Sequence, residues 1–338
     1  MKNILVTGGA GFIGSHTCAA LLDAGYSVVI ADDFSNSKPQ TLERIGEITG
    51  RDFVFCEADV TDRAAVARIF DENKIDGVIH FAGFKAVGES VEKPLEYYYN
   101  NLVSTIELAR ACVTHGVKHF VFSSSATVYG DNQAPFVETM PLLPATNPYG
   151  ETKVISEKIL SDTAKANPGF SVALLRYFNP IGAHESGLIG EAPNGIPNNL
   201  MPYITKVAKG ELKELRVFGD DYDTPDGTGV RDYIHVVDLA RGHVAALKKL
   251  ASNCGLFICN LGTGKGYSVL DVIKAYSKAC GKDLPYVIDP RRPGDIAECY
   301  ADPAKARDEL GWTAEYGIEE MCASSWKWQS MNPNGYKG

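Results

Sequence analysis

Three polar residues in the middle of the chain have the types and the spacing needed to move a proton. Tyr149 and Lys153 are four positions apart at a predicted helix start after Asn147-Pro148, and positions i and i+4 share one face of a helix. The hydroxyl and the ammonium are therefore expected to point at one site. Ser125 follows a predicted strand just upstream. A Tyr-x-x-x-Lys spacing arises by chance about once in a chain of this size, so its place in the fold decides its meaning.

A glycine-rich segment near the start of the chain has the pattern of a phosphate-binding turn. Residues 7–14 read Thr-Gly-Gly-Ala-Gly-Phe-Ile-Gly, between a predicted strand and a predicted helix. The glycines let the backbone approach a pyrophosphate, and the helix start offers free N–H groups and a positive dipole end. Asp32 lies 18 residues after Gly14, near the spacing at which a carboxylate binds the adenosine ribose. No Arg follows Asp32, so we predict NAD rather than NADP.

Two further segments are candidate cofactor contacts because they end predicted strands. Asp59-Val60 follows the third strand and could meet the adenine, and Phe81-Ala82-Gly83 ends the fourth, where small residues leave room for a dinucleotide. Each segment alone is equally compatible with an ordinary strand end. The glycine turn alone is likewise compatible with a helix that simply packs on a strand.

The elements that must hold these residues alternate between two periods. Apolar runs predict strands at Asn3–Thr7, Ser27–Ala31, Phe53–Glu57, Gly77–Phe81, Val117–Ser123 and Ser171–Tyr177. Helical spacing predicts helices at Phe12–Ala24, Arg63–Asn73, Leu95–His115 and Tyr149–Ala166. Apolar strands that alternate with helices indicate a parallel sheet covered on both faces. We therefore predict an α/β fold, with a Rossmann-type doubly wound parallel sheet and a smaller C-terminal α/β substrate lobe.

The pattern changes after Asn179, where the chain becomes rich in Pro, Gly and Asn. We predict an NAD-binding domain over residues 1–178, rejoined by part of 231–265, and a substrate-binding lobe over residues 179–338.

The composition excludes several classes of protein. The 338 residues carry 33 Lys and Arg against 42 Asp and Glu, a net charge of −9, which argues against a nucleic-acid partner. No apolar run approaches the roughly 18 residues that span a bilayer, and we expect no signal peptide at the start of the chain. The eight Cys include no Cys-x-x-Cys pair, which favours free thiols in a cytoplasmic protein. The seven His offer no set of four zinc ligands, so we predict no metal and no membrane partner.

Eight segments together resemble the extended short-chain dehydrogenase/reductase superfamily, and within it the UDP-glucose 4-epimerases of the galactose pathway. The resemblance covers nearly the whole chain. The segments are Thr7–Gly14, His80–Gly83, Lys85–Ser90, Ser123–Gly130, Tyr149–Lys153, Arg176–Pro180, Ile196–Leu200 and Gly229–Tyr233.

The resemblance implies an epimerase that interconverts UDP-glucose and UDP-galactose, with NAD held throughout as a catalyst. Tyr149 as the phenolate takes the proton of the sugar 4-hydroxyl while C4 gives up hydride. Lys153 favours the phenolate and reaches the nicotinamide ribose, and Ser125 bonds the 4-oxygen. The 4-keto sugar then rotates and is reduced from its other face.

The resemblance also implies two sets of binding residues and makes the C-terminal lobe UDP-sugar-binding. Cofactor contacts are Gly8, Gly11, Phe12, Ile13, Gly14, Asp32, Asp33, Phe34, Ser35, Asn36, Ser37, Asp59, Val60, Phe81, Ala82, Gly83, Lys85, Asn100, Ser125, Tyr149, Lys153, Tyr177 and Phe178. Contacts to the UDP-hexose substrate are Lys85, Ser125, Thr127, Tyr149, Tyr177, Asn179, Asn199, Leu200, Arg216, Val217, Phe218, Arg231, Arg292, Asp295 and Cys299. Arg231 and Arg292 are the expected diphosphate ligands, since guanidinium groups bind phosphate oxygens bidentately.

Cys299 stands where the resemblance places a gate beside the sugar 2-position. A Tyr there narrows the pocket, whereas a small residue leaves room for an N-acetyl group. We therefore hypothesise that UDP-N-acetylglucosamine and UDP-N-acetylgalactosamine (UDP-GlcNAc and UDP-GalNAc) are also interconverted. The alternative is a buried Cys without a role in selectivity.

Other functions fit these residues less well. An NDP-sugar 4,6-dehydratase shares the fold but needs an acid directly after the residue at position 125, where this chain has Ala126 and Thr127; a UDP-glucuronate decarboxylase needs a Glu there. A sterol dehydrogenase fits poorly with the Arg set. A non-catalytic NAD-sensing protein could keep the glycine turn but would not need both Tyr149 and Lys153.

The helix at 95–115 begins near three Tyr, and related epimerases pair this helix in a homodimer, which we expect here.

Overall fold

Six strands from residues 3–177 and one later strand build a seven-stranded sheet in which all paired neighbours are parallel. The structure is a computed structural model that describes residues 2–193, 199–252, 254–292 and 294–336. The strand order is β10-β6-β5-β4-β1-β2-β3. The strands are β1 (Asn3–Thr7), β2 (Ser27–Asp32), β3 (Val54–Glu57), β4 (Gly77–His80), β5 (His119–Ser125), β6 (Ser171–Tyr177) and β10 (Leu256–Leu261).

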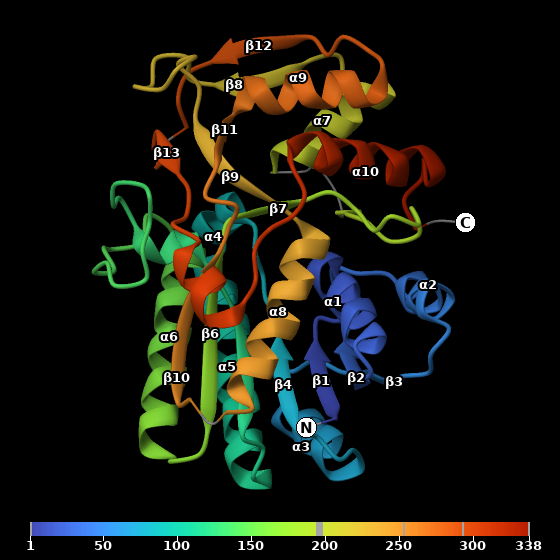
Figure 1. Cartoon of the computed structure of the whole chain (residues 1–338), viewed down its shortest axis with the longest axis vertical. Helices are drawn as coiled ribbons and strands as arrows, with labels where there is room; N and C mark the ends of the chain where they lie inside the picture. The colour runs from blue at the N-terminus through green and yellow to red at the C-terminus, as the bar shows by residue number, and fades with distance from the viewer. Residues whose placement is uncertain (1, 194–198, 253, 293, 337–338) are drawn as a thin grey trace.

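Helices cover both faces of this sheet because its strands carry apolar side chains on both sides (Figure 1). On one face Ile4 and Val6 pack with residues of α1 (Phe12–Asp23) and α8 (Val236–Leu250). On the other face Leu5 packs with residues of three further helices. These are α3 (Arg63–Glu72), α5 (Pro94–His115) and α6 (Pro148–Ala166). The doubly wound α/β fold expected from the sequence is confirmed.

The second half forms a smaller α/β lobe beyond the carboxyl ends of the sheet strands (Figure 1). A four-stranded sheet joins β7 (Asn179–Ile181), β9 (Val230–His235), β11 (Gly266–Ser268) and β13 (Glu298–Cys299). A separate pair joins β8 (Leu215–Phe218) and β12 (Tyr286–Asp289). The lobe helices are α7 (Leu200–Lys209), α9 (Val269–Cys280) and α10 (Ile318–Met331), which share one apolar core.

The chain passes into this lobe and returns before it ends. After β9, helix α8 lies along α1, and β10 pairs with β6 from Leu256↔Val172 to Leu261↔Tyr177. A last turn of π-helix at Ala306–Leu310 packs on α8 and β10. No helix in the described ranges is long and apolar enough to cross a membrane.

The elements differ from the predicted ones at a few points. Strand β5 begins at His119 instead of Val117, because Gly116 is left-handed and the Val117 N–H donates to the Cys112 carbonyl oxygen at 2.8 Å. That bond caps α5. The strand then runs to Ser125 through its pairing with β6. Three short helices within residues 1–178 were not predicted. They are α2 (Gln40–Thr49), α4 (Val87–Glu92) and the 3₁₀ turn η1 (Ala126–Tyr129).

Candidate active site

The glycine turn between β1 and α1 is shaped so that side chains cannot fill it. Gly8 has φ +68°, and a Cβ there would lie 2.8 Å from the Ala82 nitrogen. A Cβ on Gly14 would overlap the Gly8 carbonyl oxygen. Gly11 is the N-cap of α1 and supplies no side-chain cap, so the N–H groups of Phe12 and Ile13 have no partner inside the helix. A backbone cradle of this kind fits a pyrophosphate at the positive end of α1.

The Asp32 carboxylate is fixed beside this cradle at the end of β2. It accepts hydrogen bonds from Ala10 N–H at 3.0 Å, Phe34 N–H at 3.0 Å and Ser37 Oγ at 2.6 Å. The buried carboxylate therefore ties the glycine turn to the loop of residues 33–37. Phe34 turns that loop through a left-handed conformation, φ 58°. Asp33, Ser35 and Asn36 are exposed on it. A preorganised acceptor at this place suits a ribose diol.

The loop after β4 passes close to the glycine turn. Gly83 has φ +156° and lies against Asn101, whose side chain accepts from Phe84 N–H at 2.8 Å and donates to the Phe84 carbonyl oxygen at 3.0 Å. Phe81 packs on the His243 ring, 4.7 Å between centroids.

The remaining predicted cofactor residues near this sheet edge have varied surroundings. Asp59 is exposed and caps its own turn by accepting from Thr61 N–H at 2.8 Å, and Val60 is buried beside it. Lys85 is exposed and pairs with Glu191 at 3.4 Å. Asn100 is half-buried on α5.

Lys153 is buried below the carboxyl end of β5. Its Nζ donates to the Ser123 carbonyl oxygen at 2.8 Å and lies 4.9 Å from the centre of the Phe122 ring. Burial lowers the pKa of Lys153 to about 8, and the nearby Glu157 carboxylate acts in the opposite direction. The ammonium is therefore held in place by β5. Its lowered pKa makes its protonation state sensitive to nearby charged groups.

Tyr149 and Ser125 meet beside this ammonium. The Lys153 Nζ lies 5.8 Å from the centre of the Tyr149 ring. Burial raises the pKa of Tyr149, and a hydrogen bond from Ser125 lowers it in part. Tyr177 lies at the end of β6, where its hydroxyl bonds to Ser123 and burial raises its pKa. The structure thus brings the predicted Ser–Tyr–Lys set together at one sheet edge.

The lobe brings two arginines toward the same side of the molecule. Arg231 on β9 donates to the carbonyl oxygens of Val230 and Ala297, at 2.8 and 3.3 Å. Arg292 pairs with Asp295 at 2.9 Å and lies over the Phe218 ring at 5.0 Å. Both guanidinium groups act on the pKa of buried Tyr233, to which Asn179 is the β7 register partner.

Cys299 connects this lobe to the catalytic strand end. It pairs in register with Arg231 and packs against a cluster that contains Ala126 and Phe178. Burial raises the pKa of its thiol to about 11, so the side chain is a neutral, small group near pH 7. Thr127, two residues after Ser125, has a buried Oγ1 with no hydrogen-bond partner among the described residues.

Four other predicted substrate residues lie elsewhere in the lobe, in an exposed ion pair, in the lobe core or at the start of α7. Arg216 is half-exposed and pairs with Asp289 at 3.0 Å, and Val217 is buried in the lobe core, so only its backbone can meet a ligand. Asn199 is the exposed N-cap of α7, and Leu200 begins that helix. Residues 196–198 of the family-like segment lie outside the described residues.

Several residues that shape the site were not among the predicted site residues. Asn101 fixes the loop after β4, and buried His80 joins Thr7 Oγ1 at 2.8 Å. Burial lowers the pKa of His80 to about 3, so it is neutral. Glu157 and Arg176 form a buried ion pair behind Ser125. A charged Arg within an apolar strand was the available signal for that pair; nothing in the sequence distinguishes Asn101 from Asn100.

Taken together, the geometry can bind a dinucleotide and move one proton. The glycine cradle and the Asp32 carboxylate fit the pyrophosphate and ribose of NAD, and Tyr149 with Lys153 supplies a buried acid–base pair next to Ser125. No described group of three or more His, Cys, Asp and Glu side chains could hold a metal ion.

Comparisons with known proteins agree with this arrangement. Residues 4–262 match the model of the NAD dependent epimerase/dehydratase family. The UDP-glucose 4-epimerase of Bacillus subtilis is 62% identical over 335 residues, 99% of this chain and 98% of that protein. The structure of the UDP-glucose 4-epimerase from Bifidobacterium longum, in complex with NAD+ and UDP, is 59% identical with TM-score 0.94 and covers 99% of this chain and 100% of that one. The epimerase from Stenotrophomonas maltophila, with NAD and formylated UDP-arabinopyranose, has TM-score 0.96 at 50% identity over 98% of this chain and 99% of that one. The chain therefore belongs to the NAD dependent epimerase/dehydratase family, and it is an enzyme that resembles the UDP-glucose 4-epimerases of that family over its whole length.

Proposed function

We propose that the protein interconverts UDP-glucose and UDP-galactose by oxidising and re-reducing the sugar at C4. The observation that carries the proposal is the meeting of Tyr149, Ser125 and Lys153 at the sheet edge beside the glycine cradle. NAD, when bound in that cradle, accepts hydride from the sugar and returns it.

The chain's own residues perform the proton transfer and the binding. Tyr149 as the phenolate takes the proton of the 4-hydroxyl, and the Lys153 ammonium stabilises that phenolate because it is buried where charge is weakly screened. Ser125 bonds the 4-oxygen. Arg231 and Arg292 bind the diphosphate, which orients the hexose without holding the ring rigidly. Inversion at C4 follows when the oxidised ring presents its other face.

The experiment is an assay of purified protein on UDP-galactose with no added NAD. We expect UDP-glucose to form, and NAD to be released when the protein is denatured. Tyr149→Phe should retain bound NAD and lose about 10²–10⁴-fold in kcat, the range of general acid–base catalysis. Catalysis undiminished in Tyr149→Phe would refute the mechanism.

A dehydratase lacks support at the corresponding positions. Ala126 and Thr127 follow Ser125, and Ala126 is buried in an apolar cluster. Neither residue can donate the proton that elimination of water across C5–C6 requires.

We further propose that the enzyme accepts N-acetylated hexoses. The support is Cys299, a small side chain that packs against the apolar cluster to which Ala126 and Phe178 belong. The smaller volume of Cys relative to Tyr would leave space for an acetamido group at the sugar 2-position.

The protein is also proposed to be a homodimer in the cytoplasm. Leu95 and Tyr99 on α5 are 78% and 63% exposed, and large exposed apolar side chains on one helix are typical of an interface. A hollow between α5 and α6 is lined by Ile106, Val113 and Ile159. Light scattering of the purified protein tests the dimer. The eight cysteines are all free thiols, which suits a reducing compartment.

A further inference from the structure

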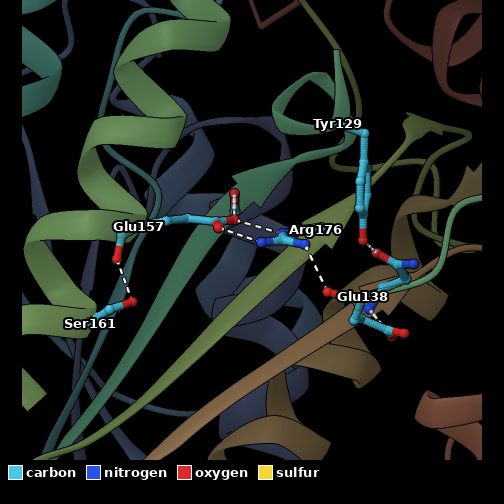
Figure 2. A network of polar contacts seen from close by, with 7 residues as sticks. Tyr129, Glu138, Glu157, Ser161 and Arg176 are labelled. Carbon is cyan, nitrogen blue, oxygen red and sulfur yellow. Dashed lines mark hydrogen bonds and ion pairs between the residues drawn. The ribbon is translucent and has the colours of Figure 1, made fainter. Parts of the chain in front are cut away.

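Figure 2 shows a buried ion pair between Glu157 on α6 and Arg176 on β6. Arg176 Nη2 donates to Glu157 Oε2 at 2.6 Å, and Arg176 Nε donates to Glu157 Oε1 at 2.9 Å. The side chains are 3% and 5% exposed. A bidentate pair of this kind fixes both partners in one geometry.

The pair joins β6 to the two elements that carry the proposed catalytic set, β5 and α6. Ser124 Oγ donates to Glu157 Oε1 at 2.6 Å, and Ser124 is the register partner of Arg176. Ser124 immediately precedes Ser125 on β5, and Glu157 lies one helical turn after Lys153 on α6. A shift of the carboxylate would therefore move Ser125 relative to Tyr149 and Lys153.

Arg176 also contacts residues other than Glu157. The Arg176 guanidinium lies 4.9 Å from the centre of the Tyr129 ring and contacts the Glu138 carbonyl oxygen at 3.5 Å. Tyr129 in turn donates to the Asn260 side-chain oxygen at 2.6 Å, on β10 (Figure 2). With Arg176 anchored from β10 and η1, the negative charge of Glu157 has a fixed place near Lys153.

Lys153 is surrounded by few other charges. The titratable and charged groups around the Tyr149–Lys153 pair come from α6, β4, β6 and α5, and they are Tyr149, Glu157, His80, Tyr177, Arg176 and Tyr97. His80 is neutral and the tyrosines are protonated near pH 7 apart from Tyr149 in its active form. Glu157 is thus the carboxylate in this set.

We propose that Glu157 is a positioning residue for the reaction proposed above: paired with Arg176 and bonded to Ser124, it keeps the Lys153 ammonium charged and the Ser125–Tyr149 geometry fixed. This role rests on the proposed epimerase function. Its support beyond geometry is that the Glu157 carboxylate raises the pKa of Lys153, against the larger effect of burial.

The test compares the pH dependence of kcat for UDP-galactose in wild type and Glu157→Gln. We expect the alkaline limb to move to lower pH by about one unit, the lower end of the shift caused by a neighbouring charge. KM and bound NAD should stay near wild-type values. A folded Glu157→Gln protein whose alkaline limb stays at the wild-type pH overturns the proposal.

Two control variants separate the effect of the negative charge from an effect on folding. Glu157→Asp and Ser124→Ala retain the negative charge, so their alkaline limb should stay at the wild-type pH even where kcat falls. If Glu157→Gln does not fold because Arg176 is left unpaired, Glu157→Gln/Arg176→Gln removes both charges, and the same direction of shift is expected. Failure of both variants to fold assigns the pair a purely structural role and also overturns the proposal. A wild-type protein without epimerase activity would instead refute the proposed function.

Discussion

At the residue scale, burial displaces the two titratable groups of the catalytic pair in opposite directions. It raises the pKa of Tyr149 and lowers the pKa of Lys153 to about 8. The Tyr149 phenol therefore holds its proton more tightly than the Lys153 ammonium does. In water the two ordinary pKa values, about 10 and 10.4, are nearly equal, and both groups are protonated at pH 7. A positive charge beside the phenol, such as that of an oxidised nicotinamide ring, would favour the phenolate and so oppose the effect of burial.

The proposed acceptance of N-acetylated sugars rests on one side chain, Cys299. Cys299→Tyr adds a ring where the thiol packs near Ala126 and Phe178. We expect kcat/KM for UDP-GalNAc to fall at least about 10-fold, in line with the 10–200-fold effect of small changes in pocket volume. Turnover of UDP-galactose should change little. Parallel assays of both substrates check this, with Cys280→Tyr, at the end of α9, as the control. Unchanged UDP-GalNAc turnover in Cys299→Tyr would contradict the gate.

At the element scale, the junction of β1 with α1 depends on the absence of a side chain. Gly14→Ala places a methyl group against the Gly8 carbonyl oxygen, so α1 must move away from the turn. We expect protein without bound NAD and a free energy of unfolding lower by about 1–3 kcal/mol. Gly46→Ala in α2 has open space around its Cβ and should be neutral or stabilising by up to about 1 kcal/mol. Absorbance of NAD released on denaturation distinguishes the two variants, and retention of NAD by Gly14→Ala would argue against the cradle.

The end of α5 is expected to be pH-sensitive. The pKa of His115 is raised, first by its hydrogen bond with Asp71 at 3.0 Å and then by the Ala111 carbonyl oxygen. A raised folded pKa means that the stabilisation is fully present below the unfolded pKa of about 6.5 and is lost as pH rises through the folded pKa. His115→Gln should therefore cost up to about 1 kcal/mol at pH 5.5 and less at pH 8.5. Urea unfolding at the two pH values measures it. Asp71→Asn should weaken the pH dependence; an equal cost of His115→Gln at both values would exclude this pair as its source.

The sheet elements were predictable because their signals are local, whereas several site contacts depend on packing. The glycine turn and the apolar strands are defined by short patterns. The start of β5 was misplaced by two residues because Val117 is used to cap α5. Helix α2 has only three apolar residues at helical spacing, and Ile45 is buried through tertiary contacts. The pairing of Glu157 with Arg176 joins residues 19 positions apart, which no local pattern can specify.

At the scale of the whole molecule, the C-terminal segment of the described chain is joined to helix α2 of the N-terminal half. Arg44 on α2 lies 5.5 Å from the Trp328 ring centre and 5.0 Å from that of Tyr336. Its Nη1 also donates to the Leu188 carbonyl oxygen at 2.8 Å and the Asn332 side-chain oxygen at 2.6 Å. This cation–aromatic cluster joins residues from both halves of the chain.

Loss of the Tyr336 ring should measurably weaken this contact between the two halves of the chain. Tyr336→Ala removes a buried ring and its hydrogen bonds with Gly190. We expect a loss of about 3 kcal/mol in the free energy of unfolding, as for other buried aromatic truncations. Tyr336→Phe keeps the ring and should lose only about 1 kcal/mol. Denaturant titration with a domain-specific fluorescence probe compares them; equal effects of the two variants would show that the ring itself contributes nothing.

Strand β10 is synthesised long after β6, the strand with which it pairs, and this has a consequence during translation. Leu256, the first residue of β10, is made 79 residues after Tyr177, the last residue of β6. At about 5–20 residues per second this leaves β6 as an open edge for about 4–16 seconds. An unpaired, apolar edge strand recruits other strands, so the nascent chain needs shielding during that interval. A messenger RNA truncated after codon 178 would give a polypeptide without β10, in which the edge of β6 stays unpaired.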